Sequence, residues 1–223
     1  MNHLDLVSEF PFVDVDGDLK TLTDLVKVLR VVRETPLKIG LRGRVLGGSN
    51  GVVRAILVRG RAEIHYGTLA IGVHVVHGGH LTLESVEVSR DPGKCTSLLN
   101  EGTVIAHTCK FDGCTVTTKD RGTIRMKDCV IHVDSGQTGM NVFGRGSTAF
   151  LAGCRFHANQ GRAAYICNGG AMTLEDCVTD HDADALYVKA EGRISIVGRS
   201  SVRVEACGHD DSSGPAFISV VAQ

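Results

Sequence analysis

The densest group of acid and base side chains in the sequence is the stretch Asp180-His181-Asp182-Ala183-Asp184. Carboxylates gathered around an imidazole on one turn could bind Ca²⁺, or could supply the acid and the base for a reaction on a sugar. Basic side chains shortly downstream could neutralise a substrate carboxylate. The alternative is a solvated polar turn, since aspartate is a common turn former. If the protein is an enzyme, we expect the catalytic residues Asp180, His181 and Asp182 and the substrate-binding residues Asp184, Lys189 and Arg193.

Histidines form a second candidate group, in which His74, His77 and His80 are spaced three apart and His65 lies upstream. On a helix this spacing could gather zinc ligands, but the apolar alternation around Val73 indicates a strand followed by a corner. The imidazoles should then diverge, and we expect them to be surface histidines. The sequence has no CxxC pair or other metal-binding signature, and it has no phosphate-binding loop. We therefore expect no metal site and no cofactor.

The composition argues against several classes of partner. The chain has 24 basic and 25 acidic residues and a formal net charge of −1, so we expect no general attraction to nucleic acid or anionic membranes. No apolar run approaches the ~18 residues of a membrane span, and the first residues do not have the pattern of a signal peptide. Eight cysteines without such a signal favour free thiols in a reducing compartment. We therefore expect the protein in the cytoplasm or in a virion.

The strands that must position these residues come from a repeat. Ten-residue segments at Gly102 and Gly122 share a small turn residue, apolar third and fifth positions, a cysteine at the eighth position and a large apolar tenth position. Alternating apolar residues predict strands with one buried face. Such a unit buries its apolar face only against the next unit, which predicts an all-β parallel β-helix of about eight coils. Copies of the pattern start at positions 40, 60, 79, 102, 122, 147, 170 and 192.

A different periodicity precedes the repeats. Apolar residues at helical spacing run from Leu22 to Val32, and Pro36 follows, which predicts an amphipathic helix over about 21–33. This helix should cover the N-terminal end of the coil stack, where a strand edge would otherwise be open. The predicted division is an N-terminal arm and capping helix over 1–36, then a β-helix with a C-terminal apolar strand over 37–223.

The repeat resembles the pectate-lyase-like right-handed parallel β-helix superfamily over roughly residues 40–204. The resemblance implies the fold but not one function, because the superfamily includes polysaccharide lyases, hydrolases, epimerases, phage tailspikes and trimeric capsid proteins. Cys-x-Phe pairs at Cys109 and Cys154 look more like its intracellular and viral members. The acidic stretch at 180–184 is similar to the Asp-Pro-His-Asp of β-helix mannuronan epimerases, without the proline. Gly208-His209-Asp210-Asp211 has only fragments of the polygalacturonase-type motifs, in the wrong order, and indicates a polar exit loop.

Cysteine recurs at the eighth position of four consecutive copies. Equivalent positions in adjacent coils lie about 4.8 Å apart with parallel Cβ vectors, which is poor disulfide geometry. We therefore predict a ladder of buried, reduced thiols inside the coils. Its members are Cys109, Cys129, Cys154 and Cys177.

Two functions remain open at this level. We favour a non-catalytic structural or interaction protein, scaffold-like or virion-like, because repeat spacings vary by only six residues (25 − 19) and leave little loop for a cleft. The alternative is a polysaccharide lyase or epimerase that acts on uronate polymers through the acidic turn at 180–184.

Self-association is expected because the sequence has more apolar residues than the inward positions of the repeat account for. The closing segment 216–221 is apolar with almost no polar alternation, so it should pack against a partner or fold back as a cap. We expect a homotrimer of parallel rods, with a dimer as the fallback; a polysaccharide or another protein is a further candidate partner. Apolar residues of which some should face outward are Val53, Leu57, Val76, Leu98, Phe143 and Tyr187.

Overall fold

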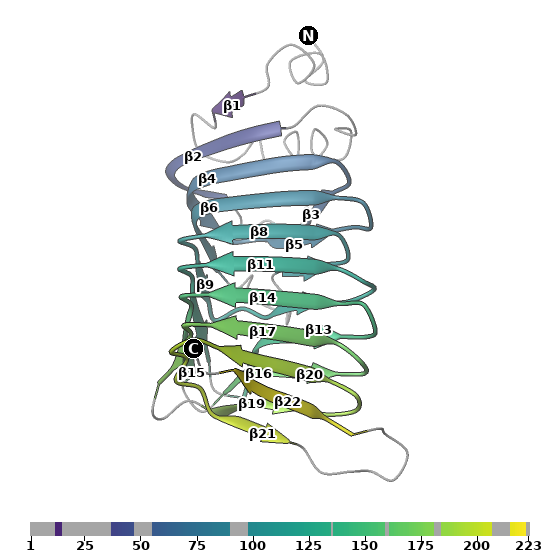
Figure 1. Cartoon of the computed structure of the whole chain (residues 1–223). Coiled ribbons are helices and arrows are strands. Elements are labelled where there is room, and N and C mark those ends of the chain that lie inside the picture. The colour runs from purple at the N-terminus through teal and green to yellow at the C-terminus, as the bar shows by residue number, and fades with distance from the viewer. Residues whose placement is uncertain are drawn as a thin grey trace.

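The chain folds as an all-β parallel solenoid. The computed structural model describes residues 12–14, 37–46, 55–89, 98–134, 136–158, 161–180, 184–206 and 215–221. All regular elements within these residues are strands, β1 to β22, stacked as successive rungs (Figure 1). The predicted helix over 21–33 lies outside the described residues, as does the stretch 208–211.

Within the described residues, the larger sheet has 14 strands and divides into two columns. Strand β6 is long enough to pair with β8 through its first half and with β9 through its second half, so the columns separate after it. The first column contains β1 (Phe12–Asp14), β2 (Leu37–Leu46), β4 (Arg61–Leu69), β6 (His80–Ser89), β8 (Thr103–His107), β11 (Thr123–Lys127), β14 (Thr148–Ala152), β17 (Ala171–Glu175), β20 (Arg193–Val197) and β22 (Phe217–Val221). The second column contains β9 (Lys110–Asp112), β12 (Val130–Val133), β15 (Arg155–Ala158) and β18 (Val178–Thr179).

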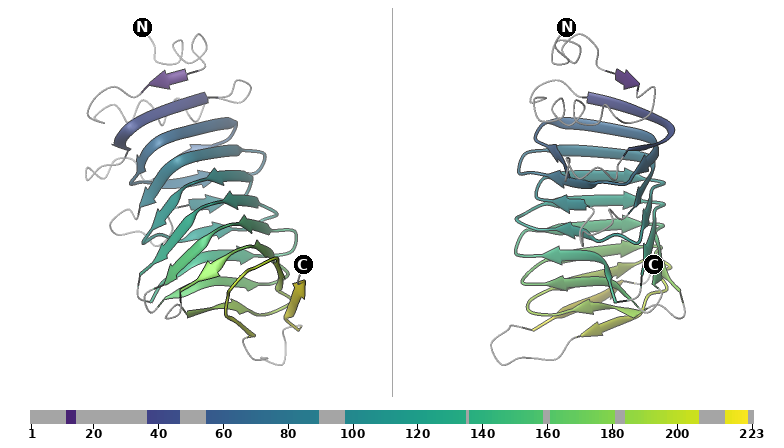
Figure 2. Two further views of the ribbon diagram at one scale, coloured as in Figure 1. Left: turned by 60° about the vertical axis from the view of Figure 1, so that its left-hand side comes forward. Right: turned by 180° about the vertical axis from the view of Figure 1, so that it is seen from behind.

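A smaller sheet of eight strands lies on another side of the coils, as the two views in Figure 2 show. Its members are β3 (Ala55–Val58), β5 (Gly72–Val75), β7 (Leu98–Asn100), β10 (Val116–Thr118), β13 (Thr138–Phe143), β16 (Arg162–Cys167), β19 (Asp184–Val188) and β21 (Val204–Ala206). The solenoid makes about six turns. The sequence predicted about eight coils. That number equals the number of strands in this sheet, whereas the number of complete turns is smaller.

Strand pairing follows the repeat pattern position by position. Ile124 and Met126, at the third and fifth positions of their copy, pair with Val104 and Ala106 on one side and are almost fully buried. The tenth position of this copy, Ile131, is also fully buried, in the second column. The predicted inward rows are thus confirmed.

Glycine begins most copies because adjacent coils approach closely there. A Cβ on Gly122 would lie 2.5 Å from the carbonyl oxygen of Asn100 in the preceding coil, and one on Gly170 would lie 2.5 Å from that of Val142. Those partners are backbone atoms, which cannot rotate away. Glycine is therefore required by the stacking of the coils at these two positions.

One inward row of the smaller sheet contains two polar side chains. Asn100 is fully buried, donates from Nδ2 to the Thr123 carbonyl at 2.9 Å and accepts from the Gly102 N–H at 3.0 Å. Thr118 pairs with Asn100 in register and is also fully buried. Within the described part of the chain, its hydroxyl has no hydrogen-bond partner.

The apolar residues that were expected to face outward divide into separate groups. Leu98 is fully buried and belongs to the core, because it pairs with Val73 and Val116 in an inward row. Phe143 is 45% exposed on the outer side of β13. Val53 lies outside the described residues, and the remaining three, Leu57, Val76 and Tyr187, are half-buried.

Candidate functional site

The second column of the larger sheet presents a row of acids and histidines on its outer side. Asp112 pairs in register with His132, and His132 pairs with His157. The backbone N–H of Asp180 donates to the Phe156 carbonyl at 3.1 Å, which places Asp180 beside His157. These four side chains, here called the Asp–His row, come from consecutive coils and are part-buried.

Each histidine of the row is oriented by one carboxylate. His132 Nδ1 lies 2.6 Å from Asp112 Oδ1, and His157 Nδ1 is hydrogen-bonded to Asp180 Oδ2. Because a carboxylate only accepts, each Nδ1 carries the proton and each Nε2 of a neutral ring has a lone pair. Among the described residues neither Nε2 has a hydrogen-bond partner. Two bases of the same orientation therefore lie about 4.8 Å apart along the solenoid.

Basic side chains lie beside the row, two residues earlier on the same strands. Lys110 Nζ is 3.2 Å from Asp112 and 3.3 Å from Glu87. Burial by itself would raise the pKa of Asp112, but hydrogen bonds from His132 and Lys110 outweigh it and lower that pKa below its ordinary value. Arg155 faces outward on β15 and has no ion-pair partner in the part of the chain that the structure describes.

The arrangement has the components of proton-transfer chemistry. An oriented neutral imidazole is a general base, its protonated neighbour is a general acid, and an unpaired guanidinium can bind a carboxylate. The row lies on a half-exposed outer face, so a bound chain would contact it from the side of the solenoid.

The structure describes four of the six residues that were expected to form a site at the acidic stretch, and these four lie in different parts of the coils. Asp180 belongs to the Asp–His row, whereas His181 and Asp182 lie outside the described residues. Asp184 begins β19 of the smaller sheet and Lys189 directly follows that strand, so neither lies in the second column of the larger sheet. Arg193 begins β20 in the first column, where its guanidinium lies 5.4 Å from the centre of the Phe217 ring.

Sequence reasoning missed three members of the row. Asp112, His132 and His157 occupy the eleventh position of the copies that start at 102, 122 and 147, and Asp180 occupies it in the copy that starts at 170. A signal was therefore present, namely titratable residues one place beyond the tenth position, which is large and apolar in the first three of these copies. A search for clusters of neighbours in sequence does not detect it.

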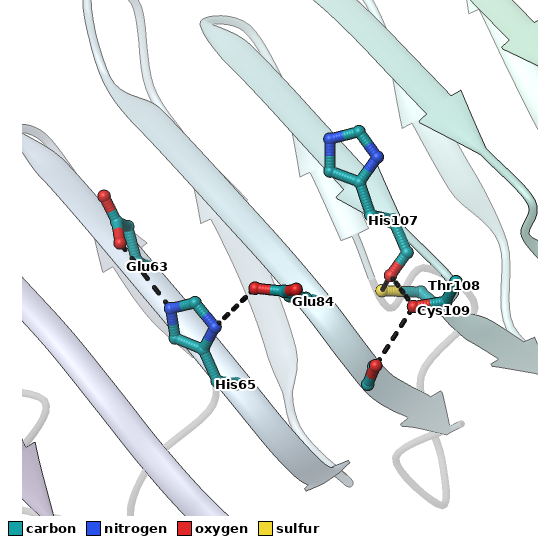
Figure 3. Close-up of polar contacts among 7 residues, drawn as sticks. Glu63, His65, Glu84, His107, Thr108 and Cys109 are labelled. Atoms are coloured by element: carbon teal, nitrogen blue, oxygen red, sulfur yellow. Dashed lines mark hydrogen bonds and ion pairs between the residues drawn. The ribbon is translucent and has the colours of Figure 1, made fainter.

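The earlier histidine group does not form a centre. His65 Nδ1 is 3.0 Å from Glu84 and its Nε2 is 3.5 Å from Glu63, so both ring nitrogens are engaged (Figure 3). His74 Nε2 contacts Glu101 at 3.0 Å on the smaller sheet. Burial opposes ionisation of Glu101, but His74 and Lys119 together lower its pKa. No three His, Cys, Asp or Glu residues in the described ranges are placed to hold a metal ion.

The predicted cysteine ladder is confirmed. Its four members, Cys109, Cys129, Cys154 and Cys177, are unpaired and at most 2% exposed. The sulfur of Cys129 accepts the Cys109 N–H at 3.4 Å. Cys109 Sγ in turn donates to the His107 carbonyl at 3.2 Å (Figure 3). Contacts with Cys109 and Cys154, together with burial, raise the pKa of Cys129. The ladder is therefore part of the core.

Comparison with known proteins identifies the family. The described residues contain no helix long and apolar enough to cross a membrane. No curated protein matches the sequence. A family model described as a right-handed beta helix region matches residues 54–208, a span that contains the whole Asp–His row. This match covers more than half of the chain, and the chain therefore belongs to the right-handed β-helix family.

Proposed function

We propose that this protein is a carbohydrate-active enzyme that abstracts a proton from a uronate polymer, as a polysaccharide lyase or epimerase does. The observation that carries the proposal is the pair of Asp–His hydrogen bonds on consecutive coils, with both Nε2 atoms on one outer face. A non-catalytic role was favoured from sequence because the chain offered little loop for a cleft. The Asp–His row weakens that argument, because it gathers acids and bases on the wall of the solenoid itself.

Each member of the row has a role in this proposal. His157 Nε2 takes the proton from the carbon next to the uronate carboxylate, and Asp180 stabilises the resulting imidazolium. Arg155, on the same strand as His157, pairs with the uronate carboxylate and so reduces the cost of the developing negative charge. His132, protonated and held by Asp112, is the acid.

The two reaction outcomes differ in where the second proton goes. In a lyase the C–H electron pair forms the C4=C5 double bond, the C4–O bond breaks, and His132 protonates the leaving oxygen. In an epimerase a solvent water instead returns a proton to C5 from the opposite face, because His132 lies on the same side as His157, and the proton on His157 goes back to solvent. Neither outcome needs an oxidant, a reductant or a co-reactant.

The test uses polygalacturonate and alginate as substrates. Ultraviolet absorbance reports the unsaturated product of a lyase, and NMR in D₂O reports exchange at C5 by an epimerase. His157→Ala should lower the rate at least about 100-fold, since positioned acid–base groups contribute roughly 10²–10⁴-fold. Arg155→Ala should raise KM more than it lowers kcat.

The matched control is His65→Ala, because His65 is a half-buried histidine on the larger sheet whose two nitrogens are already engaged. It should leave the activity unchanged. Absence of activity on both polymers, or activity that persists when His132 and His157 are both replaced, would remove the proposal.

A structural or interaction role is the second candidate function. The observation that favours it is the apolar strand β22, which exposes large side chains at the C-terminal end of the solenoid. Scaffold-like assembly, including assembly within a virion, would use such a surface and would not need the Asp–His row.

A further inference from the structure

At the C-terminal end of the solenoid, apolar side chains of the last described strand are exposed to solvent. Among the described residues, strand β22 is the last rung of the first column and pairs only with β20. Ile218 pairs in register with Ile194, and Val220 pairs with Ile196, so both residues continue the inward rows of the first column. Their neighbours are 1% and 8% exposed, whereas Ile218 is 44% and Val220 is 69% exposed. Core side chains are thus presented at this end of the rod.

The free edge of β22 also lacks the features that normally protect an edge strand. Edge strands are usually blunted by charges, proline or bulges. The segment Phe217–Val221 contains none of the charged residues and no proline. Two of its three outward residues are apolar as well, since Phe217 is 49% and Val221 is 52% exposed, and the third, Ser219, bonds to Ser195 within the chain. Both faces of the strand and its edge are therefore suited to pairing with another strand.

We propose that a second copy of this chain covers this end, with β22 pairing antiparallel to β22 of the other copy about a two-fold axis at Ser219. The sequence of the strand is self-complementary under that symmetry. Centred on Ser219, Phe217 lies opposite Val221 of the other copy, and Ile218 lies opposite Val220. Apolar residues meet apolar residues at each flanking position, and hydroxyl meets hydroxyl at the centre.

This pairing joins the two cores end to end. Each copy's inward residues, Ile218 and Val220, cover those of the other copy, and the larger sheet continues across the axis. The guanidinium of Arg193 already lies over the Phe217 ring, which holds that ring on the outer face where Val221 of the other copy would contact it. A lateral trimer would leave these residues exposed, so the geometry favours the end-to-end dimer over side-by-side packing of rods.

The first test is light scattering of the full chain at tens of micromolar. The expected mass is about twice that of one chain, 23.7 kDa. Val220→Lys should raise the dimer dissociation constant at least about 30-fold, as the loss of a central apolar anchor does. Phe143→Lys is the matched control, because Phe143 is a comparably exposed apolar residue on the side of the rod, and it should leave the mass unchanged. A single-chain mass, a three-chain mass or dissociation by Phe143→Lys alone would overturn the proposal.

Cross-linking gives a second test that does not depend on how Val220→Lys folds. Opposed residues in an antiparallel pair have Cα atoms about 4.5–5.5 Å apart, within the range of a disulfide. Ser219→Cys should therefore form a covalent dimer under mild oxidation. Ser195→Cys, one coil further from the axis in the same row, should not. Equal cross-linking by both variants, or by neither, would contradict the two-fold arrangement.

Discussion

Two neighbouring polar residues of one inward row should respond in opposite ways to the same substitution. Asn100 and Thr118 pair in register and are both fully buried. The side chain of Asn100 bridges to the Gly102 N–H and to the Thr123 carbonyl. The Thr118 hydroxyl has no partner among the described residues. We therefore expect Asn100→Val to destabilise the protein and Thr118→Val to leave it equally stable or more stable.

The size of each effect follows from the hydrogen bonds. In Asn100→Val the part-buried Gly102 N–H loses its partner, which costs about 1–3 kcal/mol, and loss of the bond to the Thr123 carbonyl costs roughly 0.5–1.5 kcal/mol more. The expected loss in the free energy of unfolding is about 2–4 kcal/mol. Thr118→Val keeps the side-chain shape and removes an unsatisfied hydroxyl, so the expected gain is between zero and about 1 kcal/mol.

Urea unfolding followed by circular dichroism measures both changes. With an m-value on the order of 2–3 kcal/mol/M, Asn100→Val should lower the midpoint by about 1 M, while Thr118→Val should not lower it. Equal midpoints for the two variants, or a comparable loss in both, would refute the assignment of the bridging role to Asn100.

Three further outcomes are expected. Burial raises the pKa of Cys167 to about 11, so at pH 8 only about 0.1% of it is thiolate, and it should label slowly in buffer and fast in urea; rapid native labelling would contradict its burial. The folded-state pKa of Asp112 is lowered, so its stabilisation is complete above its unfolded pKa of about 3.9 and is lost as the pH falls through the folded pKa. The difference in urea midpoint between the parent and Asp112→Asn should therefore shrink from pH 6 to pH 3, and a constant difference would argue against the ion pairs. Gly122→Ala should cost about 1–3 kcal/mol, since its Cβ would lie 2.5 Å from a backbone oxygen, and an unchanged midpoint would show that the coils can separate there.

Much of the architecture could be predicted from local pattern. Strand alternation places Ile124 and Met126 inward because successive side chains point to opposite faces, whatever the strand pairs with. The cysteine ladder follows from the same register. Cysteine occupies the eighth position of four consecutive copies, and parallel coils place equivalent positions next to each other. The apolar closing segment was also visible from composition, although its exposure on both faces was not.

The candidate site depended on contacts that no local window contains. His132 and His157 are 25 positions apart (157 − 132) and pair directly. Asp180 and Asp184 are four positions apart, but Asp180 follows β18 of the larger sheet and Asp184 begins β19 of the smaller one. The stacking of coils also buries Leu98 in the core and places the Arg193 guanidinium over the Phe217 ring. In a solenoid, one coil of chain advances the structure by a single strand spacing, while a few residues around a corner change the sheet. The sequence by itself therefore determined which residues face inward, and only the stacking of the coils decided which outward residues meet.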